Sequence, residues 1–117
     1  MLLVEDEPDL AVPIARFLEH EGYAVSTAGS LADARRVDVT AIEFVLLDVM
    51  LPEGEDAGFA FAQELRTAGY SGKLLFLTAR DTTGDRLRAH GLGADGLLLK
   101  PFRLRDLAAR MRALAAP

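Results

Sequence analysis

Short apolar runs alternate with longer mixed segments along all 117 residues of this chain. Four of the runs contain only leucine, valine and phenylalanine, at residues 2–4, 44–47, 74–77 and 97–99. Continuous apolar runs of this length are typical of parallel strands that are buried on both faces. A further strand is predicted at residues 23–27, where aromatic and β-branched side chains gather. The pattern therefore predicts five strands.

The segments between the strands carry helix signals. In the first of them Leu10, Ile14, Phe17 and Leu18 repeat at helical spacing, and Gly22 follows as a stop. Helices are predicted at residues 8–21, 31–37, 58–68, 81–90 and 104–115. Five alternating strand–helix units predict a doubly wound α/β fold with a five-stranded parallel sheet, and residues 1–117 are expected to form one domain.

Ionisable side chains stand directly after three of the predicted strands. Glu5 and Asp6 follow the first strand, Asp48 follows the third and Lys100 follows the last. The carboxyl ends of parallel strands lie at one edge of an open sheet, where ligands bind in α/β proteins. We therefore expect these residues to form one site for a divalent cation and a phosphoryl group. Each has an ordinary alternative, because acids at a helix entrance are favoured by the helix dipole and a strand-end lysine is often solvated.

Composition narrows the class of protein. The formal net charge of −5 argues against direct nucleic-acid binding by this domain. The chain has no cysteine, so disulfides and thiolate metal sites are excluded. No apolar stretch approaches the roughly 20 residues of a membrane span, and residues 1–4 are too short for a secretory signal. A soluble cytoplasmic protein without a membrane contact is expected.

Four motifs carry a family resemblance over essentially the whole chain. They are LLVEDEP at residues 2–8, LLDVMLP at 46–52, LTAR at 77–80 and LKPF at 99–102. In this order and spacing they resemble the signatures of response-regulator receiver domains. The resemblance implies a flavodoxin-like (βα)5 receiver fold and a place in a two-component phosphorelay.

Two further segments point to a subfamily. Residues 91–95 and 107–114 are similar to the OmpR/PhoB-like receivers, which carry a winged-helix DNA-binding domain after the receiver. The resemblance implies that such an output domain, acting in transcription regulation, is absent from residues 1–117. The chain is therefore expected to be an excised receiver domain.

The resemblance also implies a role for each acidic residue. Asp48 would accept a phosphoryl group from a sensor histidine kinase, so that the domain catalyses only its own phosphorylation and dephosphorylation. Asp6, Asp48 and the Met50 main-chain carbonyl would hold Mg²⁺, which takes oxygen ligands and keeps several waters. Glu5 would act through a bound water or maintain the shape of the site.

Three more residues would contact the phosphoryl group. Thr78 would hydrogen-bond a phosphoryl oxygen, Ala79 is small enough to leave room for it, and Lys100 would pair with the phosphorylated carboxylate. The resemblance further implies a cis peptide bond between Lys100 and Pro101. The ordinary alternative for Thr78 is a β-branched residue at the end of a strand.

The face that would respond to phosphorylation is formed by the fourth helix, the fifth strand and the fifth helix. The resemblance implies a homodimer through this face, in which Arg86 and Asp106 stand at salt-bridge positions and Asp95 and Arg110 are further candidates. Leu97 stands where the family usually has a tyrosine or phenylalanine that moves on activation. The alternative for these charges is a solvated helix face.

Three departures from the family pattern keep other hypotheses open. Leu97 excludes an aromatic rotamer switch, the loop at residues 53–57 is longer and more acidic than usual, and Gly96 replaces a usual acid. A phosphorylation-independent interaction module with the same fold is therefore the main alternative. A Mg²⁺-dependent phosphatase is a third hypothesis, although such enzymes usually have Asp-x-Asp after the first strand, whereas residues 6–9 are Asp-Glu-Pro-Asp.

Overall fold

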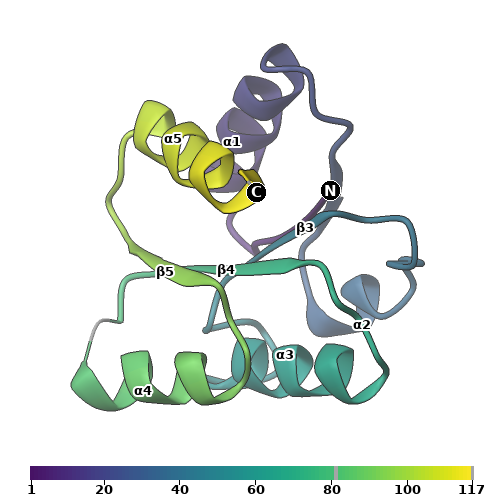
Figure 1. Cartoon of the computed structure of the whole chain (residues 1–117), viewed down its shortest axis with the longest axis vertical. Helices are drawn as coiled ribbons and strands as arrows, with labels where there is room; N and C mark the ends of the chain where they lie inside the picture. The colour runs from purple at the N-terminus through teal and green to yellow at the C-terminus, as the bar shows by residue number, and fades with distance from the viewer. Residues whose placement is uncertain (81, 117) are drawn as a thin grey trace.

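A parallel β-sheet forms the centre of the molecule, and helices cover both of its faces (Figure 1). The computed structural model describes residues 1–80 and 82–116. The strands are β1 (Leu2–Val4), β2 (Ser26–Ala28), β3 (Phe44–Leu47), β4 (Lys73–Thr78) and β5 (Gly96–Leu99). The helices are α1 (Pro8–His20), α2 (Leu31–Ala34), α3 (Ala57–Thr67), α4 (Thr83–Gly91) and α5 (Leu104–Ala115). The strand order is β2-β1-β3-β4-β5, which confirms the predicted doubly wound sheet of five parallel strands. In the part of the chain described, no helix has the length and apolar character needed to cross a bilayer.

Each face of the sheet has its own hydrophobic core. Helices α1 and α5 cover one face, and α2, α3 and α4 cover the other (Figure 1). Successive strand residues alternate between the two cores. In β1, Leu2 and Val4 join the core beneath α2, α3 and α4, whereas Leu3 joins the core beneath α1 and α5. Because both faces are covered, these strands appear in the sequence as continuous apolar runs.

Strand β2 is shorter than predicted. It begins at Ser26 rather than at residue 23, because Ser26 pairs with Leu2, the first residue of β1. The preceding Tyr23 and Val25 pack against the core beneath α1 and α5 instead. Apolar character at residues 23–25 therefore reflects packing against helices and not strand pairing.

Helix α2 is a single turn that ends at Ala34, before the predicted end at residue 37. Ser30 caps it as expected, because its hydroxyl accepts a hydrogen bond from the Asp33 N–H at 3.1 Å. Beyond the helix, the Val37 N–H donates to the Ala34 carbonyl in a tighter, 3₁₀-type turn. The half-buried Val37 side chain packs against the core, which turns the chain inward at this point.

Helix α4 was predicted to begin at residue 81, a position outside the described residues. The helix begins at Thr83, with Thr82 as its N-cap. The Thr82 hydroxyl accepts from the Asp85 N–H at 3.0 Å, and the Asp85 carboxylate accepts from the Thr82 N–H at 3.4 Å. This reciprocal capping box satisfies two backbone donors at the start of the helix.

Strand register brings the predicted site residues to one edge of the sheet. Strands β1 and β3 end in register, which makes Glu5 and Asp48 neighbours. Strands β4 and β5 also end in register, and the Lys100 N–H donates to the Thr78 carbonyl at 2.8 Å. The peptide bond between Lys100 and Pro101 is cis, as the family resemblance implied. Four residues at strand ends therefore lie together at the carboxyl edge of the sheet: Glu5, Asp48, Thr78 and Lys100.

Candidate functional site

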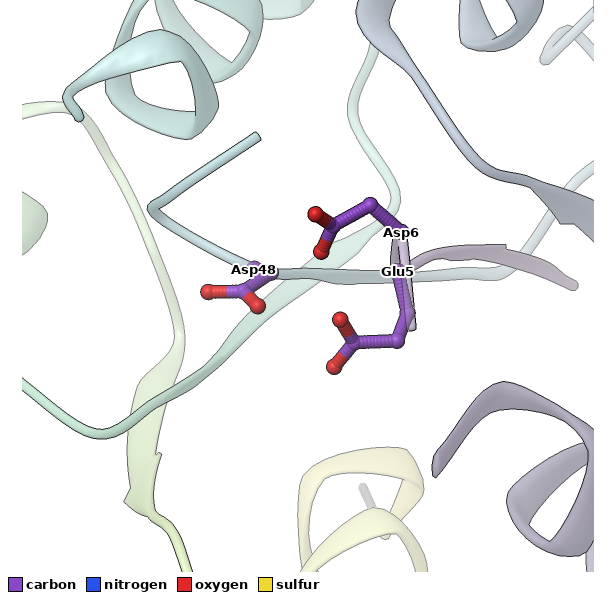
Figure 2. A group of neighbouring side chains, drawn as sticks. All are labelled: Glu5, Asp6 and Asp48. Carbon is purple, nitrogen blue, oxygen red and sulfur yellow. The ribbon is translucent and has the colours of Figure 1, made fainter. Parts of the chain in front are cut away.

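Three carboxyl groups meet at the ends of β1 and β3. Figure 2 shows the side chains of Glu5, Asp6 and Asp48 gathered in one group. One carboxylate oxygen of each residue lies within 4.8 Å of those of the other two. Glu5 is 4% exposed and Asp48 is 7% exposed, whereas Asp6 faces solvent. Two negative groups are thus held away from water, where charges of the same sign repel most strongly.

Lys100 supplies the opposing charge. Its Nζ donates to Asp48 Oδ2 at 2.8 Å and also to Glu5 Oε1. The Lys100 side chain is 14% exposed. Burial by itself would lower the pKa of Lys100, but the hydrogen bonds to Asp48 and Glu5 raise that pKa above its usual value. The ammonium group therefore stays charged between the two acids.

The surroundings of Glu5 raise the pKa of its carboxyl group. Burial raises the pKa of Glu5 to about 7; the hydrogen bond from Lys100 opposes this rise and the charge of Asp48 adds to it. A bound divalent cation would favour the carboxylate form and counteract the shift. Protonation of Glu5 would thus compete with binding of such a cation.

The donor set of the cluster suits Mg²⁺. Carboxylate oxygens are the hard ligands that this ion prefers, and the exposed Asp6 leaves the site open to the waters that Mg²⁺ retains. Glu5, Asp6 and Asp48 together carry more negative charge than Lys100 balances. A divalent cation at this place would relieve the remaining repulsion.

A pocket of about 250 Å³ opens beside the acidic cluster. It is lined by Asp6, Glu7, Asp48, Met50, Leu51, Ala79 and Lys100. The Met50 N–H donates to Asp48 Oδ1 at 3.1 Å, which fixes the turn after β3. Ala79 lies in the lining of this pocket, and Thr78 is fully buried.

Gly58 also belongs to this site, although the sequence pattern predicts only a helix start at this position. A Cβ atom at Gly58 would lie 2.0 Å from the Asp48 carbonyl oxygen. The Gly58 N–H also donates to the Val49 carbonyl at 2.8 Å. The start of α3 therefore lies closer to the backbone of Asp48 than a residue with a Cβ atom would permit. The sequence signal that could have identified this position is a glycine ten residues after Asp48.

The sequence pattern predicts no individual role for Arg80 or Glu53, but both make specific contacts. The Arg80 N–H donates to Thr78 Oγ1 at 3.0 Å, and its guanidinium contacts the loop before α3. Glu53 accepts from the N–H groups of Leu31 and Ala32 at 2.9 and 3.0 Å. The acidic loop at residues 53–57 is therefore attached to α2 on one side and to Arg80 on the other. Arg80 belongs to the LTAR motif, but its contacts depend on the tertiary structure.

The model of the response regulator receiver domain family matches residues 1–112. The chain belongs to the response-regulator receiver family. Transcriptional regulatory protein PmrA of Pectobacterium parmentieri is 41% identical to this receiver domain over 115 residues, and TcrA of Mycobacterium tuberculosis is 44% identical over 119 residues. These matches cover 97% and 98% of the receiver domain but 51% and 45% of the two regulators. The chain thus spans about half the length of the curated relatives that it matches.

Solved structures agree with this assignment. The non-phosphorylated HemR receiver domain of Leptospira biflexa superposes with a TM-score of 0.90 at 33% identity, covering 99% of this chain and 94% of that one. DrrB, an OmpR/PhoB homologue of Thermotoga maritima, superposes with a TM-score of 0.83 at 26% identity, covering 95% and 49%. The predicted flavodoxin-like receiver fold and the OmpR/PhoB-like subfamily are confirmed.

On the α4–β5–α5 face of the receiver domain, Arg86, Asp106 and Arg110 are exposed. Leu97 is 9% exposed and borders a cleft of about 160 Å³. The cleft is lined by Arg86, Ala89, His90, Ala94, Asp95, Gly96 and Leu97. The position that the family usually fills with an aromatic ring is therefore taken by a smaller, buried side chain beside an open space.

Asp95 contacts residues of its own chain. Its carboxylate accepts from the Leu74 N–H at 2.9 Å and lies 3.4 Å from Arg66 Nη2 and 4.0 Å from Lys73 Nζ. These contacts attach the start of β5 to the start of β4. The charge of Asp95, a predicted dimer residue, is thus used by contacts within the chain.

Proposed function

We propose that this receiver domain accepts a phosphoryl group from a sensor histidine kinase onto Asp48, in a step that requires Mg²⁺. The observation that carries the proposal is the pairing of the buried Asp48 with Lys100, next to two further acids at the sheet edge. Membership of the receiver family and the relation to transcriptional regulators support the same function.

The transfer can be followed atom by atom at Asp48. One carboxylate oxygen attacks the phosphorus of the donor phosphohistidine, the phosphorus–nitrogen bond breaks, and the imidazole takes up a proton. The product is an acyl phosphate. Catalysis of such a transfer rests on position and charge neutralisation, which Lys100 provides from the protein side. Asp6, Asp48 and the Met50 carbonyl would hold Mg²⁺, which when bound offsets the charge of the transferred group.

A cleft beside Lys100 favours a protein donor in addition to small phosphodonors. It measures about 480 Å³ and separates the N-terminal half of α1 from the segment that joins β5 to α5. Its lining is mostly apolar and includes Leu10, Pro13, Ile14 and Phe102. An apolar surface that adjoins the phosphoacceptor site is suited to contact with a helix of the kinase.

The proposed output passes through the α4–β5–α5 face. Phosphorylation of Asp48 adds charge and acceptor oxygens that attract Thr78 and Lys100. The receiver would then form a homodimer in which Arg86 pairs with Asp106 of the second copy, and an attached winged-helix domain would bind DNA. This domain would work in the cytoplasm, catalyse only its own phosphorylation and dephosphorylation, and make no direct contact with nucleic acid.

Intact-mass spectrometry with acetyl phosphate as the donor tests the proposal. The receiver domain is incubated with and without Mg²⁺, beside the Asp48→Asn variant. A single phosphoryl adduct that requires both Mg²⁺ and Asp48 is the expected result. A folded protein that never gains the adduct, from acetyl phosphate or from a phosphorylated kinase, would contradict the proposal.

That negative outcome would favour a phosphorylation-independent interaction module. The observation in its favour is Leu97, which is buried on the proposed responding face and cannot act as an aromatic rotamer switch. If the domain is such a module, the wild-type protein and the Asp48→Asn variant would bind the partner with equal affinity.

A further inference from the structure

Arg80 directly follows Ala79, and three acceptors hold its side chain. Nη1 donates to the Glu55 carbonyl at 2.8 Å and to Asp56 Oδ1 at 2.7 Å, and Nη2 donates to Asp85 Oδ1 at 2.8 Å. Glu55 and Asp56 precede α3, whereas Asp85 lies in the first turn of α4. One guanidinium therefore connects the end of β4 with the start of α3 and the start of α4.

Asp56 is shared between two arginines. Its Oδ2 lies 3.2 Å from Arg88 Nη1, and the Arg88 guanidinium lies 4.6 Å from the centre of the Phe59 ring. The hydrogen bond from Arg80 holds the pKa of Asp56 below its usual value, so this carboxylate is charged at neutral pH. Asp56, Arg80, Asp85 and Arg88 form what we call the Arg80 network. It balances two acids against two arginines.

The Arg80 network reaches the phosphoryl site through Thr78. The Arg80 N–H donates to Thr78 Oγ1 at 3.0 Å. A hydroxyl oxygen that accepts this bond keeps its hydrogen for another acceptor, such as a phosphoryl oxygen. A movement of the buried Thr78 toward Asp48 that keeps this hydrogen bond carries the Arg80 backbone with it. The contacts of the Arg80 guanidinium with Asp56 and Asp85 resist that movement.

We propose that Arg80 is a positioning residue whose ion pair with Asp56 holds Thr78 and the start of α4 away from the arrangement that a phosphoryl group on Asp48 favours. The inference rests on the proposed function and adds a regulatory role for the acidic loop at residues 53–57. A ligand shifts an equilibrium only by its differential affinity for the two states. Contacts made in one state alone therefore weaken the apparent affinity for a ligand that selects the other.

The Asp56→Asn variant removes the charge while keeping the size of the side chain and a residue type suited to a helix N-cap. Beryllofluoride with Mg²⁺ serves as the phosphoryl analogue, and ¹H–¹⁵N NMR titration measures its affinity. We expect Asp56→Asn to bind beryllofluoride about three- to tenfold more tightly than wild type. Before any beryllofluoride is added, the amide shifts of α4 should move toward their bound positions.

Arg80→Gln is the second variant, and it keeps the backbone N–H that contacts Thr78. It should shift the affinity and the α4 amides in the same direction as Asp56→Asn. The double variant should add little to the effect of either single change on the α4 shifts, because both variants remove the Arg80–Asp56 ion pair. A purely structural salt bridge would lower stability without moving the α4 shifts toward the bound positions.

Glu55→Gln is the matched control. It makes the same change of charge in the same loop, and among the described residues the Glu55 side chain takes part in no hydrogen bond or ion pair. It removes the same unit of negative charge as Asp56→Asn and leaves the Arg80 network intact. We expect its α4 shifts to match those of wild type.

Each outcome separates this inference from the proposed function. If Asp56→Asn behaves like Glu55→Gln, or binds beryllofluoride more weakly than wild type, the inference is wrong and the proposed function stands. If folded wild type does not bind beryllofluoride with Mg²⁺, the proposed function is wrong and the inference falls with it.

Discussion

Lys100 Nζ lies 2.8 Å from Asp48 Oδ2, although the two residues are 52 positions apart in the chain. The same ammonium group donates to the buried Glu5. Without a metal ion, Lys100 is therefore the main cation that balances the acidic cluster. This relationship makes the stability of the receiver domain depend on the site at which phosphorylation is proposed.

Loss of the Lys100 charge should destabilise the metal-free protein. Lys100→Met leaves Glu5 and Asp48 buried without their cation, and we expect the free energy of unfolding to fall by about 2–4 kcal/mol. Saturating Mg²⁺ should recover part of this loss, because it supplies positive charge at the same acids. Urea unfolding with EDTA or with Mg²⁺ measures both effects.

Lys73→Met is the control, since Lys73 and Lys100 are the two lysines of the chain. The Lys73 side chain is 42% exposed, and its Nζ lies 4.0 Å from Asp95. Its replacement should cost about 0–1 kcal/mol, with no dependence on Mg²⁺. Equal losses for the two variants would contradict the role assigned to Lys100.

The stability of the metal-free protein should depend on pH through Glu5. The unfolded chain releases the Glu5 proton near 4.5, whereas the folded protein retains it until about pH 7. Between these values the folded state binds more protons, so the Glu5 contribution to the free energy of unfolding declines as the pH rises from about 4.5 to about 7. Urea unfolding in EDTA across this range should show a weaker decline for Glu5→Gln.

The exposed Glu7 provides the comparison for this pH profile. Glu7→Gln should leave the difference between pH 4.5 and pH 7 as in wild type. A Glu5→Gln profile that runs parallel to the wild-type profile would show that Glu5 does not carry the raised pKa.

A methyl group at Gly58 should disturb both the fold and the phosphoacceptor. Its Cβ would lie 2.0 Å from the Asp48 carbonyl oxygen and 2.7 Å from Val49 Cα. We expect Gly58→Ala to lower the free energy of unfolding by about 1–3 kcal/mol and to slow phosphorylation of Asp48. Thermal unfolding and intact-mass kinetics with acetyl phosphate measure the two effects.

Gly84→Ala tests whether the loss of stability is specific to position 58. At Gly84 the nearest atom to a Cβ is Thr82 Oγ1 at 3.7 Å, an ordinary contact. Alanine in a helix restricts the unfolded chain, so we expect a small gain of about 0.5 kcal/mol. A Gly58→Ala protein as stable as Gly84→Ala would refute the close approach of α3 to Asp48.

Exchange of charges tests the proposed dimer. Arg86→Asp and Asp106→Arg should each weaken self-association in beryllofluoride and Mg²⁺ by about fivefold or more, because like charges then face each other. The double variant should recover association, since the pair is restored with its signs reversed. Sedimentation velocity over a range of protein concentrations measures the dimer fraction.

Arg36→Asp is the charge-matched control for the dimer experiment. Arg36 follows α2, whereas the proposed interface lies on α4, β5 and α5. Reversal of the Arg36 charge should leave self-association at the wild-type level. Failure of the double variant to recover association would contradict the pairing of Arg86 with Asp106.

Most of the architecture could be predicted because it depends on local patterns. β3 was predicted with its observed bounds, residues 44–47, since a continuous apolar run buried on both faces has few alternatives. The meeting of Glu5, Asp48 and Lys100 was predicted from topology, because parallel strands end at one edge of the sheet. The bounds of β2 and α2 were wrong, because the register with β1 and the packing of Val37 decide them.

The sequence by itself determined the order of the elements, the family and the residues proposed to carry the chemistry. These follow from short-range apolar periodicity and from motifs whose chemistry requires particular residue types. Only the tertiary structure decided which charges outside that site meet: Asp95 with Arg66, and Asp56 with Arg80. Such pairs, and the raised pKa of Glu5, depend on how elements distant in the chain pack and exclude water, which no local pattern encodes.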